Sequence, residues 1–175
     1  RMAVTARHYD LACASAGVEV AQGAVGAGRG MSSFQLKGGI GTASRQALLC
    51  GVARYTVGAL VLANYGVQAN LVWGGQPLGR RLAARQPARS DPEKGSIIMV
   101  LATDAPLDAR QLRRLALRAA AGLARTGSVY GHGSGDIALA FSTAYTLPHL
   151  PTGLMPAVTL VHEALLDPLF QAGAD

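Results

Sequence analysis

The chain has 175 residues, half of them hydrophobic, which is enough for one domain with a buried core and excludes a disordered tail. Only 15% of the residues are charged, which excludes a charge-rich coiled coil. The formal net charge is +6, but nine of the 16 Lys and Arg residues lie between Arg80 and Arg118 with no aromatic residue among them. This pattern favours a solvated surface over a nucleic-acid site, so no nucleic-acid partner is expected.

The first half of the chain alternates between apolar and glycine-rich segments. Residues 18–24 and 31–37 alternate in polarity and predict two strands around a glycine turn. Residues 57–62 and 67–72 predict a second pair of strands, joined by a turn at 64–66. The glycine-rich segment 38–44 does not fit a phosphate-binding loop, because no Lys-Ser or Lys-Thr follows its last glycine, so nucleotide binding is disfavoured.

A polar segment in the middle of the chain precedes a strongly apolar one. Residues 79–94 carry Arg, Pro, Ser and Asp and predict an exposed, mobile connector. Directly behind it, residues 96–103 form a continuous apolar run, which predicts a strand buried on both faces.

The second half predicts a helix and a further strand. Asp108 precedes a helix with one apolar face and outward-turned arginines, which Gly127 can end. Its apolar positions are Leu112, Leu115, Ala116, Ala119 and Leu123. A glycine-rich turn over 131–136 leads into a strand over 137–142, and residues 160–172 predict a final partial helix.

Cysteine, histidine and hydropathy patterns argue against several classes of site. Cys13 and Cys50 lie in apolar stretches without a ligand pattern, so we expect them to be small buried side chains rather than disulfide or zinc residues. The four histidines show no metal-ligand spacing, and we expect no metal or cofactor. Arg54 interrupts the apolar stretch 47–63, so no transmembrane helix or membrane partner is expected.

Two segments could carry nucleophilic chemistry. His132, Ser134 and Asp136 make a catalytic triad conceivable, but the glycine spacing around Ser134 does not match a nucleophile elbow. The stronger candidate is the Gly95-Ser96 pair, between the polar connector and the apolar strand. If the chain were cut between them, the Ser96 hydroxyl would be the nucleophile. Its own α-amine, with a pKa of about 8, would be the adjacent base.

Four segments in chain order resemble one enzyme family. They are residues 37–45 (KGGIGTASR), 62–66 (LANYG), 95–107 (GSIIMVLATDAPL) and 131–137 (GHGSGDI). Together they are similar to the L-aminopeptidase D-Ala-esterase/amidases and β-peptidyl aminopeptidases, peptidase family S58. The resemblance runs from about residue 20 to residue 171.

The resemblance implies an α/β protein with a four-layer α/β/β/α sandwich like that of N-terminal nucleophile hydrolases and ornithine acetyltransferases. The precursor would cleave itself between Gly95 and Ser96, so that residues 1–95 and 96–175 belong to two subunits. Ser96 would be the nucleophile, Ser134 and Asp136 would contact it and its amine, and Asn64 would stabilise the oxyanion. The substrates would be short peptides, amino-acid amides or esters, and the enzyme would be an oligomer of processed heterodimers.

The resemblance leaves two alternatives open. The chain could be a catalytically incomplete scaffold fragment, because the family's second oxyanion donor, a Tyr, would precede Arg1. It could also be an acyltransferase like the ornithine acetyltransferases, although those use Thr where this chain has Ser96. The chain is expected to be a fragment that lacks both ends of the enzyme. A cytoplasmic location is expected, with a periplasmic one as the alternative.

Overall fold

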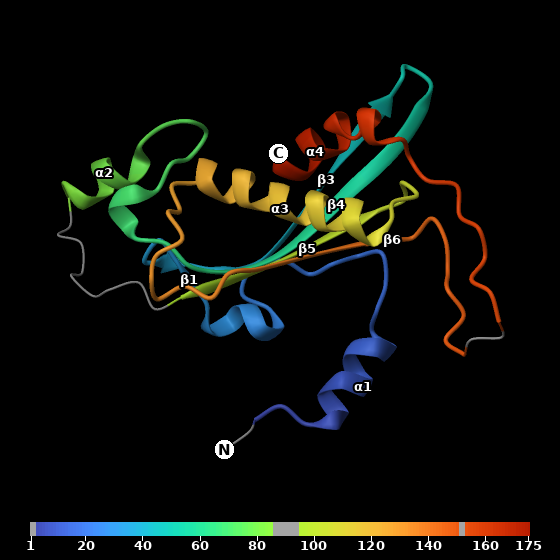
Figure 1. The fold of residues 1–175 in the computed structure, drawn as a ribbon. Coiled ribbons are helices and arrows are strands. Elements are labelled where there is room, and N and C mark those ends of the chain that lie inside the picture. Colours follow the sequence, from blue (N-terminus) through green and yellow to red (C-terminus); the bar gives the residue numbers. More distant parts are fainter. Residues whose placement is uncertain (1–2, 86–94, 151–152) are drawn as a thin grey trace.

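The computed structural model describes residues 3–85, 95–150 and 153–175, which contain a mixed four-stranded sheet with α3 and α4 on one side and α1 on the other (Figure 1). The strand order is β3-β4-β5-β6. The first three strands are antiparallel neighbours, and β6 runs parallel to β5. The bounds are β3 (Gly39–Leu49), β4 (Ala53–Asn64), β5 (Ser96–Thr103) and β6 (Ile137–Ser142).

The remaining elements are short, apart from α3. A two-stranded hairpin consists of β1 (Ser32–Ser33) and β2 (Leu36–Lys37). The α-helices are α1 (Ala6–Ala14), α2 (Leu78–Ala83), α3 (Ala109–Arg125) and α4 (Asp167–Ala174). Single 3-10 turns are η1 (Gly26–Gly30), η2 (Gln68–Asn70) and η3 (Glu163–Leu165). None of the helices in the described ranges has the length and apolar character needed to cross a membrane.

The core lies between the sheet and α3. Alternate β5 residues, among them Ile97 and Leu101, are buried toward this helix, as expected for side chains that alternate across a strand. Leu115 of α3 and Leu169 of α4 are fully buried in the same cluster. The predicted helix start is confirmed, because Asp108 accepts a 2.7 Å hydrogen bond from the backbone N–H of Gln111 in a capping box.

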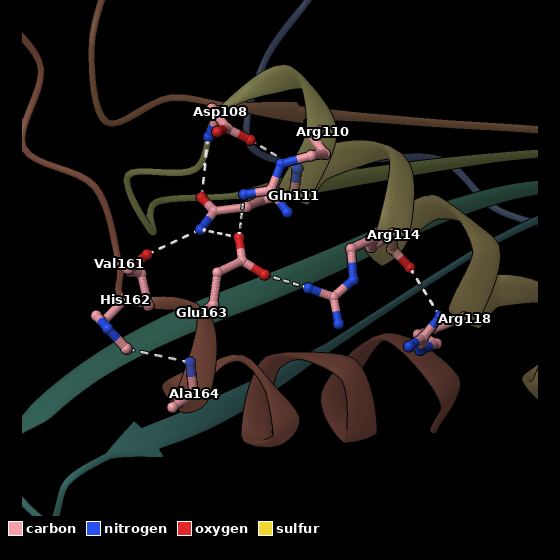
Figure 2. A network of polar contacts seen from close by, with 9 residues as sticks. All are labelled: Asp108, Arg110, Gln111, Arg114, Arg118, Val161, His162, Glu163 and Ala164. Atoms are coloured by element: carbon pink, nitrogen blue, oxygen red, sulfur yellow. Dashed lines mark hydrogen bonds and ion pairs between the residues drawn. The ribbon is translucent and has the colours of Figure 1, made fainter.

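Charged residues of α3 hold η3 and α4 against this helix (Figure 2). The Glu163 carboxylate binds Arg110 and Arg114, and it accepts a 3.0 Å hydrogen bond from Gln111 Nε2. The guanidinium of Arg118 lies 4.2 Å from the centre of the Phe170 ring. The prediction that the arginines of this helix all turn outward is therefore wrong for Arg114 and Arg118, which are half-buried under α4.

The face of the sheet opposite α3 is only partly covered by the described residues. Leu60, Ile98, Leu139 and Phe141 are exposed there, with exposed fractions of 37 to 57%. The prediction that β5 is buried on both faces is therefore wrong. A shallow hollow of about 570 Å³ lies on this face under residues 18–20, and neither Ser96 nor Asn64 lines it.

Several predicted elements in the first half differ from the structure. Residues 18–24 form no strand, and only Gly23 bridges to Ile40. The predicted strand over 31–37 is split into β1 and β2, because Phe34 and Gln35 have left-handed backbone angles and form the turn. Residues 67–72 contain η2 instead of a strand, and the partners of β4 are β3 and β5.

Other predictions fail for local reasons. The two cysteines are exposed, because α1 buries none of its residues and Cys50 lies in the turn between β3 and β4 with φ +52°. The predicted connector begins with α2, and its residues 86–94 lie outside the described ranges. The single helix predicted over 160–172 is divided into η3 and α4, with Pro168 in the first turn of α4.

Candidate active site

The site lies where β5 and β6 begin. Parallel strands start at the same edge of a sheet, and the register pairs Ile98 with Ile137. Ser96 is the first residue of β5, and the glycine-rich turn ends at Asp136 directly before β6. The topology therefore brings together two segments that are distant in the sequence.

Two hydrogen bonds join these segments, and a third lies within the glycine-rich turn. The backbone N–H of Gly135 donates to Ser96 Oγ at 2.9 Å. The backbone N–H of Ile97 donates to Asp136 Oδ1 at 3.2 Å, and Ser134 Oγ donates to the same oxygen at 2.6 Å. The Asp136 carboxylate therefore lies one peptide unit from the nitrogen of Ser96.

Asn64 lies opposite Ser96 on the neighbouring strand. The two residues are register partners at the end of the β4–β5 ladder. Because side chains alternate along strands, both belong to the same face as Leu60 and Ile98, which α3 does not cover. The backbone N–H of Ser32 donates to Asn64 Oδ1 at 3.0 Å and holds the amide from the side of β1.

Gly95 must be a glycine because the chain crosses the end of β4 here. A Cβ at position 95 would lie 1.9 Å from the carbonyl oxygen of Asn64, far inside van der Waals contact. The absence of a side chain lets the residue before Ser96 approach the backbone of Asn64.

Two tyrosines near Asp136 are held protonated. Burial raises the pKa of the Tyr65 phenol, and the negative charge of Asp136 adds to this rise, while hydrogen bonds with Thr126 and Ser33 oppose it. Burial, followed by the charge of Asp136, also raises the pKa of Tyr130. Both phenols are therefore neutral at physiological pH, where they can donate hydrogen bonds but cannot act as bases.

The structure brings together all five residues that the sequence singled out: Asn64, Gly95, Ser96, Ser134 and Asp136. Their catalytic roles stay predictions. His132 of the conceivable triad is exposed, and the Asp136 oxygen receives its hydrogen bonds from Ser134 and Ile97. Sequence reasoning missed the Gly135 amide as a partner of Ser96, although its place between Ser134 and Asp136 was a signal.

Solved structures define the fold class. The chain superposes with a TM-score of 0.87 on the PH0078 protein from Pyrococcus horikoshii OT3, at 47% identity over 96% of this chain and 45% of that one. It superposes with a TM-score of 0.78 on the L-aminopeptidase D-Ala-esterase/amidase from Ochrobactrum anthropi, at 40% identity over 91% of this chain and 43% of that one. That enzyme is described as a prototype of the serine aminopeptidases with a variant of the Ntn hydrolase fold. The predicted fold class is thereby confirmed.

The family follows from the sequence match. All residues, 1–175, match Peptidase family S58, and the chain belongs to this family. It is 43% identical over 153 residues to the β-peptidyl aminopeptidase BapA of Sphingosinicella xenopeptidilytica, which covers 81% of this chain and 38% of that protein. The chain therefore spans less than half the length of this relative.

Proposed function

We propose that this chain is the nucleophile-bearing part of a self-processing serine aminopeptidase, which removes the N-terminal residue from short peptides, amides or esters. The observation that carries the proposal is the contact set at Ser96. Its Oγ accepts a hydrogen bond from Gly135, and the Asp136 carboxylate accepts one from the backbone N–H of Ile97, the residue that follows Ser96. Membership of a peptidase family supports the same conclusion.

The first reaction would be processing of the chain. Ser96 Oγ attacks the carbonyl carbon of Gly95, and the Ser96 nitrogen leaves as an amine, which turns the peptide bond into an ester. Water hydrolyses the ester, so that Gly95 ends in a carboxylate and Ser96 begins a new chain with a free α-amine. This amine can then act as the general base for its own hydroxyl.

Turnover would use the same atoms on a peptide substrate. The amine takes the hydroxyl proton as Oγ attacks the first carbonyl, and it returns the proton to the leaving group. Asn64 would donate its side-chain N–H to the developing oxyanion. Asp136, held by Ser134 at 2.6 Å, would orient the ammonium form of the amine, and water would release the acylated residue from Ser96.

The test is to express the full-length protein and determine the masses and N-termini of its fragments. We expect two fragments, one beginning at Ser96, and a single uncut chain for Ser96→Ala. Ser44→Ala, which changes an exposed serine of β3, should process normally. A Ser96→Ala chain that still splits at this bond would assign the cut to an external protease. An uncut wild-type chain would favour the scaffold alternative.

Substrate specificity is tested on the processed enzyme. A peptide with a free amino terminus should be hydrolysed, and its N-acetylated form should not. Equal hydrolysis of both would contradict an aminopeptidase. We extend the proposal to an oligomer of processed heterodimers, on the family resemblance alone, and sedimentation of the processed protein measures the subunit number.

A further inference from the structure

The amide of Asn64 has a defined orientation. The backbone N–H of Ser32 can only donate, so the Asn64 atom that faces it at 3.0 Å is the acceptor Oδ1. The other amide atom, Nδ2, therefore points away from β1 and carries two N–H donors. Nδ2 is therefore the atom of this amide that could donate to an oxyanion.

The peptide group that holds Asn64 is itself held by a cation. The N–H of Ser32 and the carbonyl of Met31 belong to one peptide unit. Lys37 Nζ donates to the Met31 oxygen at 2.9 Å. A continuous chain of hydrogen bonds therefore runs from the Lys37 ammonium through this peptide unit to the Asn64 amide.

Lys37 uses all its donors in this position. Besides Met31, its ammonium donates to the carbonyl oxygens of Gly28 and Gly38, each at 2.8 Å. An ammonium has three N–H donors, so these three carbonyls satisfy it completely. The ammonium therefore joins three backbone segments: η1, the residue before β1 and the residue after β2.

The loop around Lys37, residues 28–38, lies close to the end of β4. A Cβ at Gly38 would lie 2.4 Å from the carbonyl oxygen of Ala63 and 3.0 Å from the nitrogen of Ser32. Gly38 N also donates to the Met31 oxygen at 3.0 Å. The loop therefore has little freedom beside Asn64, and Lys37 is the charged side chain that fixes its carbonyls.

We infer that Lys37 is a positioning residue for the oxyanion amide, acting through the Met31–Ser32 peptide unit on Asn64. The ammonium polarises the Met31 carbonyl, which strengthens the Ser32 N–H as a donor, and this bond in turn polarises and orients the Asn64 amide. The inference rests on the proposed function, because it needs Asn64 to stabilise an oxyanion. Lys37 itself touches no reacting atom.

The test is a double-mutant cycle on the full-length, processed enzyme with a free-amine peptide substrate. Lys37→Met should lower kcat by about tenfold or more with KM nearly unchanged, because a displaced donor weakens mainly the transition state. In an Asn64→Ala background the same change should lower kcat no further. Arg29→Met, which removes an exposed cation of the same loop, is the matched control and should leave kcat unchanged.

Chemical rescue separates positioning from a loss of folding. The Lys37→Cys variant should be as slow as Lys37→Met, and aminoethylation of its thiol should restore most of kcat, because it returns an ammonium at the same chain length. Wild-type enzyme treated in the same way controls for the exposed Cys13 and Cys50.

The outcomes are distinct. The inference would be overturned if Lys37→Met lowered kcat equally in the wild-type and Asn64→Ala backgrounds, if it raised KM alone, or if aminoethylation did not restore kcat. In each of these cases, hydrolysis of the peptide by the wild-type enzyme would still support the proposed function. A wild-type enzyme that is processed but does not hydrolyse free-amine peptides would overturn both.

Discussion

Gly135 donates its backbone N–H to Ser96 Oγ at 2.9 Å, although the two residues are 39 positions apart in the chain. The parallel pairing of β5 and β6 creates this contact, and it sets the side-chain oxygen of Ser96 against the glycine-rich turn. The Ser96 hydroxyl is therefore held by a backbone N–H group. Replacing a side chain elsewhere in the turn does not directly remove this hydrogen bond.

Asp136→Asn should lower hydrolysis of a free-amine peptide by about a hundredfold and change its pH profile. The variant keeps the shape but removes the negative charge near the Ser96 nitrogen, so the α-amine loses the group that stabilises its protonated form. The measurement is kcat/KM against pH. Asp10→Asn, on the exposed helix α1, should match the wild type. An unchanged Asp136→Asn profile would leave Asp136 as a turn residue only.

Asn64→Ala should lower kcat by an amount equivalent to about 3 kcal/mol while KM changes little, because an oxyanion donor acts mainly in the transition state. Steady-state kinetics on the processed enzyme measure both constants. Asn70→Ala, at an exposed position in η2, is the control. If the folded Asn64 variant turns over at the wild-type rate, the oxyanion is stabilised elsewhere.

Gly95→Ala should block or strongly slow processing. Its Cβ would lie 1.9 Å from the carbonyl oxygen of Asn64, so the peptide bond to be cut must move relative to Ser96. Gel electrophoresis of the full-length protein over time measures the uncut fraction. Gly41→Ala is the matched control, because an added Cβ there meets no atom within 4 Å. Normal processing of Gly95→Ala would show that the segment shifts freely.

Glu163→Gln should lower the stability of the fold at neutral pH and make that stability less dependent on pH in the acidic range. The hydrogen bond from Arg110, together with Gln111 and Arg114, lowers the pKa of Glu163 below its usual value of 4.5. A carboxyl group whose pKa falls on folding stabilises the fold above its unfolded pKa. It loses that contribution as the pH falls through the folded pKa.

Denaturant unfolding at pH 7 and pH 3 measures this effect. The wild type should lose more stability between the two values than Glu163→Gln, and Glu19→Gln, at an exposed position, should behave as the wild type. If Glu163→Gln and Glu19→Gln lost equal stability between pH 7 and pH 3, the network in Figure 2 would have no role in holding η3 against α3.

Two elements of the second half could be predicted from the sequence because each depends on one strong local pattern. The continuous apolar run 96–103 predicts β5, and the helical periodicity after Asp108 predicts α3. The β3–β4 hairpin was missed because its turn places Cys50 at φ +52°, a backbone conformation for which cysteine gives no signal. Polar residues of β3, such as Arg45, also hide its alternation.

The candidate site was predictable only in part. Spacing in the chain identified Ser96 as a serine between a polar and an apolar segment, and the resemblance supplied Asn64, Ser134 and Asp136. Their proximity depends on the parallel register of β5 with β6, which local patterns do not determine. The contacts of Lys37 depend on three backbone carbonyls, and a sequence contains no signal for those.

The pairing of β4 with β5 determines how the two products of a cut before Ser96 would behave. Residues 57–64 are paired with residues 96–103 along the whole length of β5, and α4, from the second product, packs against β3 and β4 of the first. The two products would contribute hydrogen-bonded neighbouring strands to one sheet, so they could not dissociate without breaking backbone hydrogen bonds. Separation of the two products would require breaking the β4–β5 ladder in the middle of the sheet. The two products of one precursor would therefore stay associated. Processed copies that carry different tags would not exchange subunits when mixed.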